Sequence, residues 1–150
     1  MSAWYFDNPE REAQVIAEAR GWLGTPFWHR QHAKGLGVDC VQLVGQVMVA
    51  CGAIEGYDFG EYALDWSLHQ ERSLIEEFIQ GTGRFARLTE GDLHPGDVAC
   101  FRIGKTTHHC GVMVSDREFV HVMIKRRASV GNILDPTWST RLGAVYRALA

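Results

Sequence analysis

The periodicity of the apolar residues changes a little past the middle of this 150-residue chain. In the first part, apolar positions recur every three or four residues, which is the repeat of an amphipathic helix. In the second part they form short runs rich in β-branched and aromatic residues, separated by turn residues such as Pro95-Gly96 and Gly104. Helices followed by strands are typical of an α+β fold, so we predict N-terminal helices packed on a C-terminal antiparallel sheet.

Capping residues predict where the helices begin and end. Asn8-Pro9 is typical of an N-cap followed by a first-turn proline, and Gly24 of a helix end. Ser67 and Gln70 have the spacing of a capping box. The predicted helices cover about residues 9–23, 40–51 and 67–81, with a long ordered loop at 53–65 that could line a groove. The predicted strands cover 85–88, 97–103, 110–114, 119–124, 129–133 and 144–149.

The stretch 35–44 places a cysteine at the start of the second predicted helix. Asp39 is a good N-cap, with Gln42 three residues later, so Cys40 lies in the first helical turn. There the unpaired backbone N–H groups and the helix dipole favour a thiolate over a thiol. Because the thiolate is the nucleophilic form, covalent catalysis is one interpretation of Cys40. The other is a small apolar side chain that fills the end of a helix.

Length and charge exclude several classes of protein. A chain of 150 residues corresponds to one domain, here 1–150. Its net charge of -3 gives no broad electrostatic attraction to nucleic acid or to an anionic membrane. No apolar run approaches the ~20 residues of a membrane span, and the first residues lack the segments of a secretory signal. We therefore expect synthesis in the cytoplasm without a signal peptide, no membrane span and no nucleic-acid partner.

The four cysteines, Cys40, Cys51, Cys100 and Cys110, occur without C-x-x-C pairs. That spacing argues against a disulfide framework and against a zinc ribbon. We predict no cofactor and no metal, and the alternative is a zinc site that combines Cys40 and Cys110 with histidines.

A cysteine nucleophile needs a base, and histidine has a pKa near neutrality. His108 and His109 precede the predicted strand 110–114, and His121 lies in the next strand. Side chains alternate along a strand, so a two-residue hairpin at Asp116-Arg117 would place His109 and His121 on opposite faces. A three-residue connection at 115–117, or a bulge, places them on one face, and we predict this odd connection.

Several short motifs occur in a distinctive order. They are Trp22-Leu23-Gly24-Thr25-Pro26-Phe27, Gly37-Val38-Asp39-Cys40, Pro95-Gly96-Asp97-Val98, His109-Cys110-Gly111-Val112 and Phe119-Val120-His121. This ordered set resembles the NlpC-type cell-wall endopeptidases, a family of papain-like cysteine peptidases, over roughly residues 13–124. The chain looks most like the compact single-domain members encoded by phages and gene transfer agents. The resemblance implies a papain-like α+β fold in which the helix of the nucleophile packs on the antiparallel sheet.

The resemblance also implies a catalytic role for three side chains. Cys40 becomes the nucleophile, and its backbone N–H contributes to an oxyanion hole. His109 becomes the base, in preference to His108, because the family places its base two positions before a glycine. His121 becomes the residue that orients the imidazole of His109. The implied reaction is hydrolysis of a peptide amide through a thioester intermediate.

The implied substrate is a peptidoglycan stem peptide, typically cleaved between D-glutamate and a diamino acid. Asp39 and Phe27 become substrate contacts, although capping alone could explain Asp39. The family usually has Ser-Gly after the cysteine and a tyrosine at the end of its first motif, where this chain has Val41, Gln42 and Phe27. Phage-tail or gene-transfer-agent proteins are the implied partners, with action at the cell wall in a phage-like particle or on lysis. The alternatives are a catalytically silent tail component with this fold and the Cys/His metal-binding module.

Overall fold

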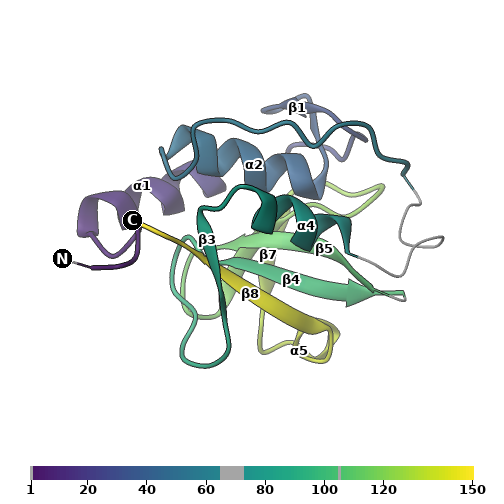
Figure 1. Ribbon diagram of the computed structural model, residues 1–150. Helices are drawn as coiled ribbons and strands as arrows, with labels where there is room; N and C mark the ends of the chain where they lie inside the picture. The colour runs from purple at the N-terminus through teal and green to yellow at the C-terminus, as the bar shows by residue number, and fades with distance from the viewer. Residues whose placement is uncertain (1, 65–72, 105) are drawn as a thin grey trace.

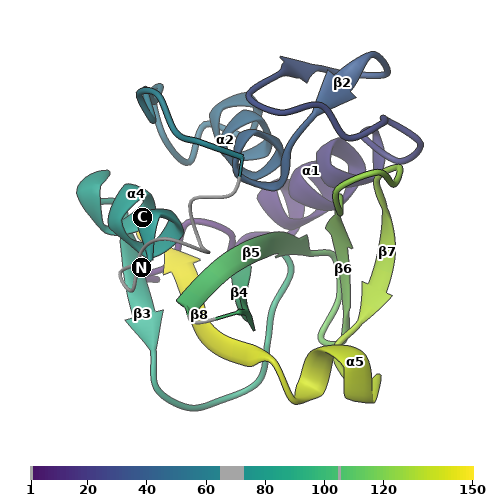
Figure 2. The same ribbon diagram turned by 90° about the vertical axis from the view of Figure 1, so that its right-hand side faces the viewer.

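The computed structural model describes residues 2–64, 73–104 and 106–150 and shows helices packed on a curved antiparallel sheet (Figure 1). Helices α1 (Pro9–Arg20) and α2 (Cys40–Ala50) lie on one side of the sheet, and the short α5 (Pro136–Ser139) lies on the other (Figure 2). Helix α4 (Leu74–Gly81) contacts β5 beside α2. The predicted α+β arrangement is confirmed, but the sequence did not indicate α5.

The main sheet has the strand order β3-β8-β4-β5-β6-β7, and every neighbouring pair is antiparallel. All six predicted strands are present, although β5 begins at Thr106 rather than Cys110 and β6 ends at His121 rather than Ile124. A small second sheet, β1 (His32–Ala33) with β2 (Gly37–Val38), was not predicted. The strands of the main sheet are β3 (Phe85–Leu88), β4 (Val98–Ile103), β5 (Thr106–Met113), β6 (Glu118–His121), β7 (Ser129–Asn132) and β8 (Leu142–Ala148).

Helix α1 begins where its cap predicts and ends earlier than expected. The side chain of Asn8 accepts hydrogen bonds from the N–H groups of Glu10 and Arg11 at 2.9 and 3.1 Å. The predicted end at Gly24 is wrong, because the helix ends at Arg20 and the chain continues in turns. Gly24 still has a positive φ of 86°, and its N–H donates to Ala128 O beyond β6. The loop before α2 is thereby attached to the sheet.

The third predicted helix is shorter than expected. Ser73 has extended backbone angles, and its side chain accepts a hydrogen bond from the Glu76 N–H, so α4 begins at Leu74. A continuous helix over 67–81 is therefore wrong at Ser73. The predicted cap at Ser67 lies outside the described residues.

Helix α2 is apolar on most of its surface because it is covered from several sides. Leu43, Val47 and Met48 are buried among α1, the sheet and residues 53–64. Gly45 allows the chain to approach closely, since a Cβ there would lie 2.6 Å from the ring of Tyr57. The segment 53–64 has no helix or strand, as predicted, and it runs along α2 towards the end where Cys40 lies (Figure 1).

The two chain ends pair with each other. Tyr5 N donates to Ala148 O and Ala150 N donates to Ala3 O, both at 2.9 Å, and Trp4 forms a β-bridge with Leu149. Both ends therefore lie together, on the left in Figure 1. No helix within the described ranges has the length and apolar character needed to cross a membrane.

Candidate active site

The N-terminus of α2 presents Cys40. Asp39 has extended backbone angles, and its Oδ1 accepts the Gln42 N–H at 2.9 Å, so the predicted N-cap is confirmed. Only this half of the expected capping box forms, because the side chain of Gln42 bonds instead to the hydroxyl groups of Tyr62 and Tyr57. Cys40 is half-buried in the first helical turn, beside the backbone N–H groups that have no partner within the helix.

A cavity of about 350 Å³ lies in front of Cys40, at the end of the sheet where β5 begins and β6 ends. The predicted nucleophile, the predicted base His109 and the predicted substrate contacts Asp39 and Phe27 all line it. Its remaining walls are mostly apolar. They include Val41, Leu64, Ile103, Val122, Met123 and Ile124.

His121 lies behind His109 rather than in the wall of this cavity. His109 Nε2 and His121 Nδ1 are 2.9 Å apart, and both side chains are buried. The sheet register explains the contact, since Val112 pairs with Val120 and the strands are joined by residues 115–117. The predicted odd connection is therefore confirmed, and it places both imidazoles on one face of the sheet.

Gly111 allows the two histidines to meet. A Cβ at this position would lie 2.8 Å from Val120 O and 3.1 Å from the Cβ of His121. Contacts below 3.0 Å force a neighbour to shift, and here that neighbour is the backbone of β6. The glycine two residues after His109 thus keeps β6 close enough for His121 to reach the imidazole.

Trp138, on α5, covers the histidine pair from the side away from α2. Its ring stacks on His109 with the centroids 5.4 Å apart and meets the ring of His121 edge-on at 4.9 Å. The rings of Phe101 and Phe119 also contact Trp138, so aromatic side chains enclose the histidine pair on this side. The sequence did not indicate this role, because a four-residue helix leaves no apolar period to detect.

Burial sets the charge of the two imidazoles. Burial, together with the neighbouring His121 and His108, holds the pKa of His109 well below its usual value. Burial also lowers the pKa of His121, to about 4. Both rings are therefore neutral at neutral pH, and a neutral imidazole is the form that can accept a proton.

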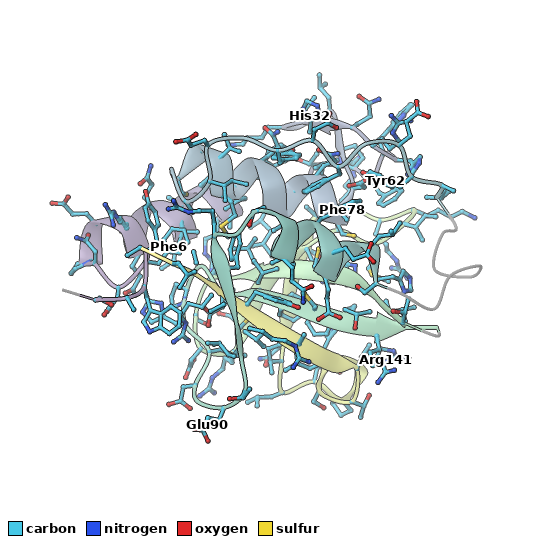
Figure 3. All side chains as sticks on the ribbon, in the orientation of Figure 1. Phe6, His32, Tyr62, Phe78, Glu90 and Arg141 are labelled. Atoms are coloured by element: carbon cyan, nitrogen blue, oxygen red, sulfur yellow. The ribbon has the colours of Figure 1, made fainter. Side chains whose placement is uncertain are left out.

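Asp39 does more than cap the helix. Its Oδ2 accepts hydrogen bonds from Arg30 N at 2.8 Å and from the Tyr62 hydroxyl at 2.6 Å. Burial and the bond to Asp39 raise the pKa of Tyr62, which keeps the hydroxyl protonated as a donor. Figure 3 shows Tyr62 on the segment above α2, near Phe78 of α4, with their ring centroids 6.1 Å apart.

Tyr62 and His29 also line the cavity, and sequence reasoning did not single out either of them. The aromatic loop at 53–65 gave a partial signal, since it was expected to line a groove. His29 was interpreted as a surface residue, but its Nδ1 is 4.0 Å from Asp39 Oδ2 and its Nε2 is 2.9 Å from Tyr62 O. As for the alternative metal site, the parts of the chain that the structure describes contain no group of three or more His, Cys, Asp or Glu placed to hold a metal ion.

Comparisons with known proteins place the chain in a family. The profile of the NlpC/P60 family matches residues 24–147. "Murein DD-endopeptidase MepS/Murein LD-carboxypeptidase" of Escherichia coli K12 is 27% identical over 143 residues, covering 95% of this chain and 66% of that protein. This chain thus spans just under two-thirds of the curated relatives that it matches.

Solved structures show the same fold at low sequence identity. An NlpC/P60 family protein from Bacillus cereus has a TM-score of 0.64 at 17% identity, covering 93% of this chain and 40% of that one. The NlpC/p60 domain of the peptidoglycan hydrolase SagA has a TM-score of 0.55 at 17% identity, covering 89% and 96%. With a family profile that matches most of its length, the chain belongs to the NlpC/P60 family.

Proposed function

We propose that this protein is a cysteine peptidase that hydrolyses amide bonds in peptidoglycan stem peptides. One observation carries the proposal: Cys40, at a helix N-terminus, and His109, hydrogen-bonded to His121, line the same cavity. The likeness to a protein named as a murein endopeptidase supports the class of substrate.

The histidine pair determines which nitrogen acts as the base. His109 Nε2 is engaged with His121 Nδ1, so Nδ1 of His109 is the atom left for catalysis. In a neutral His109 with Nε2–H donating to His121, the lone pair is on Nδ1. That atom takes the thiol proton of Cys40, while the end of α2 stabilises the thiolate.

The thiolate then attacks the carbonyl carbon of the scissile amide, and the Cys40 backbone N–H donates to the oxyanion. The tetrahedral intermediate collapses to a thioester as the His109 imidazolium protonates the leaving amine. Water, deprotonated by the same imidazole, hydrolyses the thioester and regenerates the thiol. Asp39 and Phe27 contact the substrate from the cavity wall. The bond between D-glutamate and a diamino acid is the proposed site of cleavage.

The decisive test is Cys40→Ala incubated with purified peptidoglycan, with released fragments identified by mass. We expect fragments from the wild-type protein and none from Cys40→Ala. Cys51→Ala is the matched control, because Cys51 is buried at the far end of α2. Release of the same fragments by Cys40→Ala would exclude Cys40 as the nucleophile. An inactive wild-type protein would favour the silent tail component. Association with a phage-like particle, and action at the wall from within it or on lysis, remain predictions of the resemblance.

A further inference from the structure

Three of the four cysteines lie one behind another in space, from the wall of the cavity into the core. Cys40 lines the cavity, and the Cys110 thiol donates to the backbone carbonyl of Cys40, with Sγ and O 3.5 Å apart. The neighbouring Cys40 also raises the pKa of the Cys110 thiol. Cys100 is the direct cross-strand partner of Cys110 in β4 and β5. The proposed nucleophile therefore has a second thiol directly beneath it.

Strand alternation explains why Cys110 faces Cys40. His109 contacts Trp138 on one side of β5, so the next residue, Cys110, points to the other side, where α2 packs. Cys51 cannot take this place, because it lies eleven positions along the helix, about 16 Å at 1.5 Å per residue. Cys110 is thus the thiol that the fold places against Cys40.

We propose that Cys40 and Cys110 are an oxidisable dithiol, in which a peroxide oxidises Cys40 and Cys110 then closes a disulfide. The Cys110 sulfur is 3.5 Å from the backbone carbonyl oxygen of Cys40, so a small movement of the two side chains can bring their sulfur atoms to the ~2.05 Å of a disulfide. The disulfide would block the nucleophile until a dithiol reduces it. This effect on hydrolysis rests on the proposed function, whereas formation of the disulfide does not.

The chemistry balances in two steps. The Cys40 thiolate attacks one oxygen of the peroxide, which gives the Cys40 sulfenic acid and releases hydroxide. The Cys110 sulfur then attacks the Cys40 sulfur, the S–O bond breaks, and the thiol proton leaves with the hydroxyl group as water. Two electrons pass from the pair of thiols to the peroxide in total.

The environments of the two thiols fit this order. Cys40 is half-buried in the cavity wall, whereas Cys110 is only 1% exposed, so a peroxide meets Cys40 first. The hydrogen bond with Cys40 and burial raise the pKa of Cys110. The second step should therefore be slow at neutral pH and faster at alkaline pH, because the thiolate is the attacking form.

The test is titration of the reduced full chain with hydrogen peroxide, followed by non-reducing digestion and mass mapping. We expect a Cys40–Cys110 linked peptide, a whole-chain mass lower by two hydrogens, and recovery of the free thiols with dithiothreitol. Because mass is measured directly, the outcome does not depend on whether the chain hydrolyses peptidoglycan. A Cys100–Cys110 linkage, or Cys40 sulfinic acid with Cys110 still reduced, would overturn the proposal.

Variants separate the roles of the thiols. In Cys110→Val, and in Cys110→Ser as a second choice should the first fail to fold, Cys40 should proceed to sulfinic and sulfonic acid that dithiothreitol does not reverse. Cys100→Ala, which removes the competing cross-strand partner, should still form the Cys40–Cys110 link. Reversible oxidation of Cys40 in both Cys110 variants would show that Cys110 is not the resolving thiol.

Discussion

Two polar pairs lie near opposite ends of β4, one half-buried and one buried, and they differ in how their charge is compensated. Near the chain ends, Asp97 Oδ1 and Oδ2 accept bonds from Arg147 Nε and Nη2, each at 2.8 Å, so two opposite charges compensate each other. At the other end, His109 and His121 share one hydrogen bond and carry no charge at neutral pH. We infer that the first pair serves stability and the second is held ready for proton transfer.

Replacing the proposed base should have the largest effect. His109→Gln keeps a polar side chain but has no nitrogen that can take the thiol proton. We expect the rate of stem-peptide hydrolysis to fall by about 10²- to 10⁴-fold, the usual contribution of a general base. The free energy of unfolding at pH 7, measured in urea, should change much less than the activation free energy of hydrolysis. A variant that unfolds readily yet retains its rate would contradict the comparison.

Removing charge from the other pair should act on stability. Asp97→Asn removes the negative charge that balances Arg147 and leaves only the bond to the Asp92 carbonyl unchanged, so we expect the free energy of unfolding to drop by up to about 3 kcal/mol. The matched control is Asp116→Asn, since Asp116 and Arg117 form an exposed ion pair worth at most about 1 kcal/mol. Denaturant titration of both variants measures the difference. Equal losses would mean that burial does not distinguish the two ion pairs.

Lowering the pH should reduce the free energy of unfolding, because protonating the buried imidazoles is unfavourable. The pKa of His121 falls from 6.5 unfolded to about 4 folded, so between these values the unfolded chain binds the extra proton. Stability is therefore fully present above pH 6.5 and declines as pH falls, by about 3 kcal/mol for this residue. His109 acts in the same direction. Urea titrations from pH 7 to pH 4 should show a shallower decline in His121→Gln than in the wild type.

A methyl group at Gly111 should have a smaller, more local effect. Gly111→Ala pushes β6 away from β5 and moves His121 from its partner. We expect hydrolysis to slow by about 10- to 100-fold, as misplacement of catalytic groups by about 1 Å commonly does. Gly56→Ala is the control, because a Cβ at Gly56 meets no atom within 4 Å. Unchanged kinetics in Gly111→Ala would show that β6 tolerates the shift.

The sequence predicted the features that depend on local rules. The cap at Asp39 follows from neighbouring residues, and the shared face of His109 and His121 follows from parity across a short hairpin. Trp138 and Tyr62 could not be assigned in this way. Trp138 meets the histidines through a bend of the chain after β7. Tyr62 lies 23 positions after Asp39 and reaches it from the irregular segment that runs back along α2. Contacts of this kind depend on the path of the chain and leave no periodic signal.

The position of Cys110 could be predicted from the sequence only in part. Alternation along β5 predicts that it faces away from His109, but nothing in the spacing of residues 40 and 110 predicts that their thiols meet. The helix ends at 20 and 74 differ from prediction for a related reason. Gly24 is held by the sheet, and the Ser73 side chain, which caps α4, also donates to Thr107 O of β5, so tertiary contacts overrode the local pattern.

The pairing of residues 3–5 with residues 148–150 has a practical consequence for engineering. Phe6, close to the chain ends, and Tyr62, in the cavity wall, lie on opposite sides of the molecule in Figure 3, so a segment fused at either end would emerge away from the proposed catalytic cavity. Adjacent ends also suit circular permutation, in which a short linker joins the original termini and new termini are introduced elsewhere in the chain. Tags or carrier domains could thus be attached at the chain ends without obstructing the cavity beside Cys40.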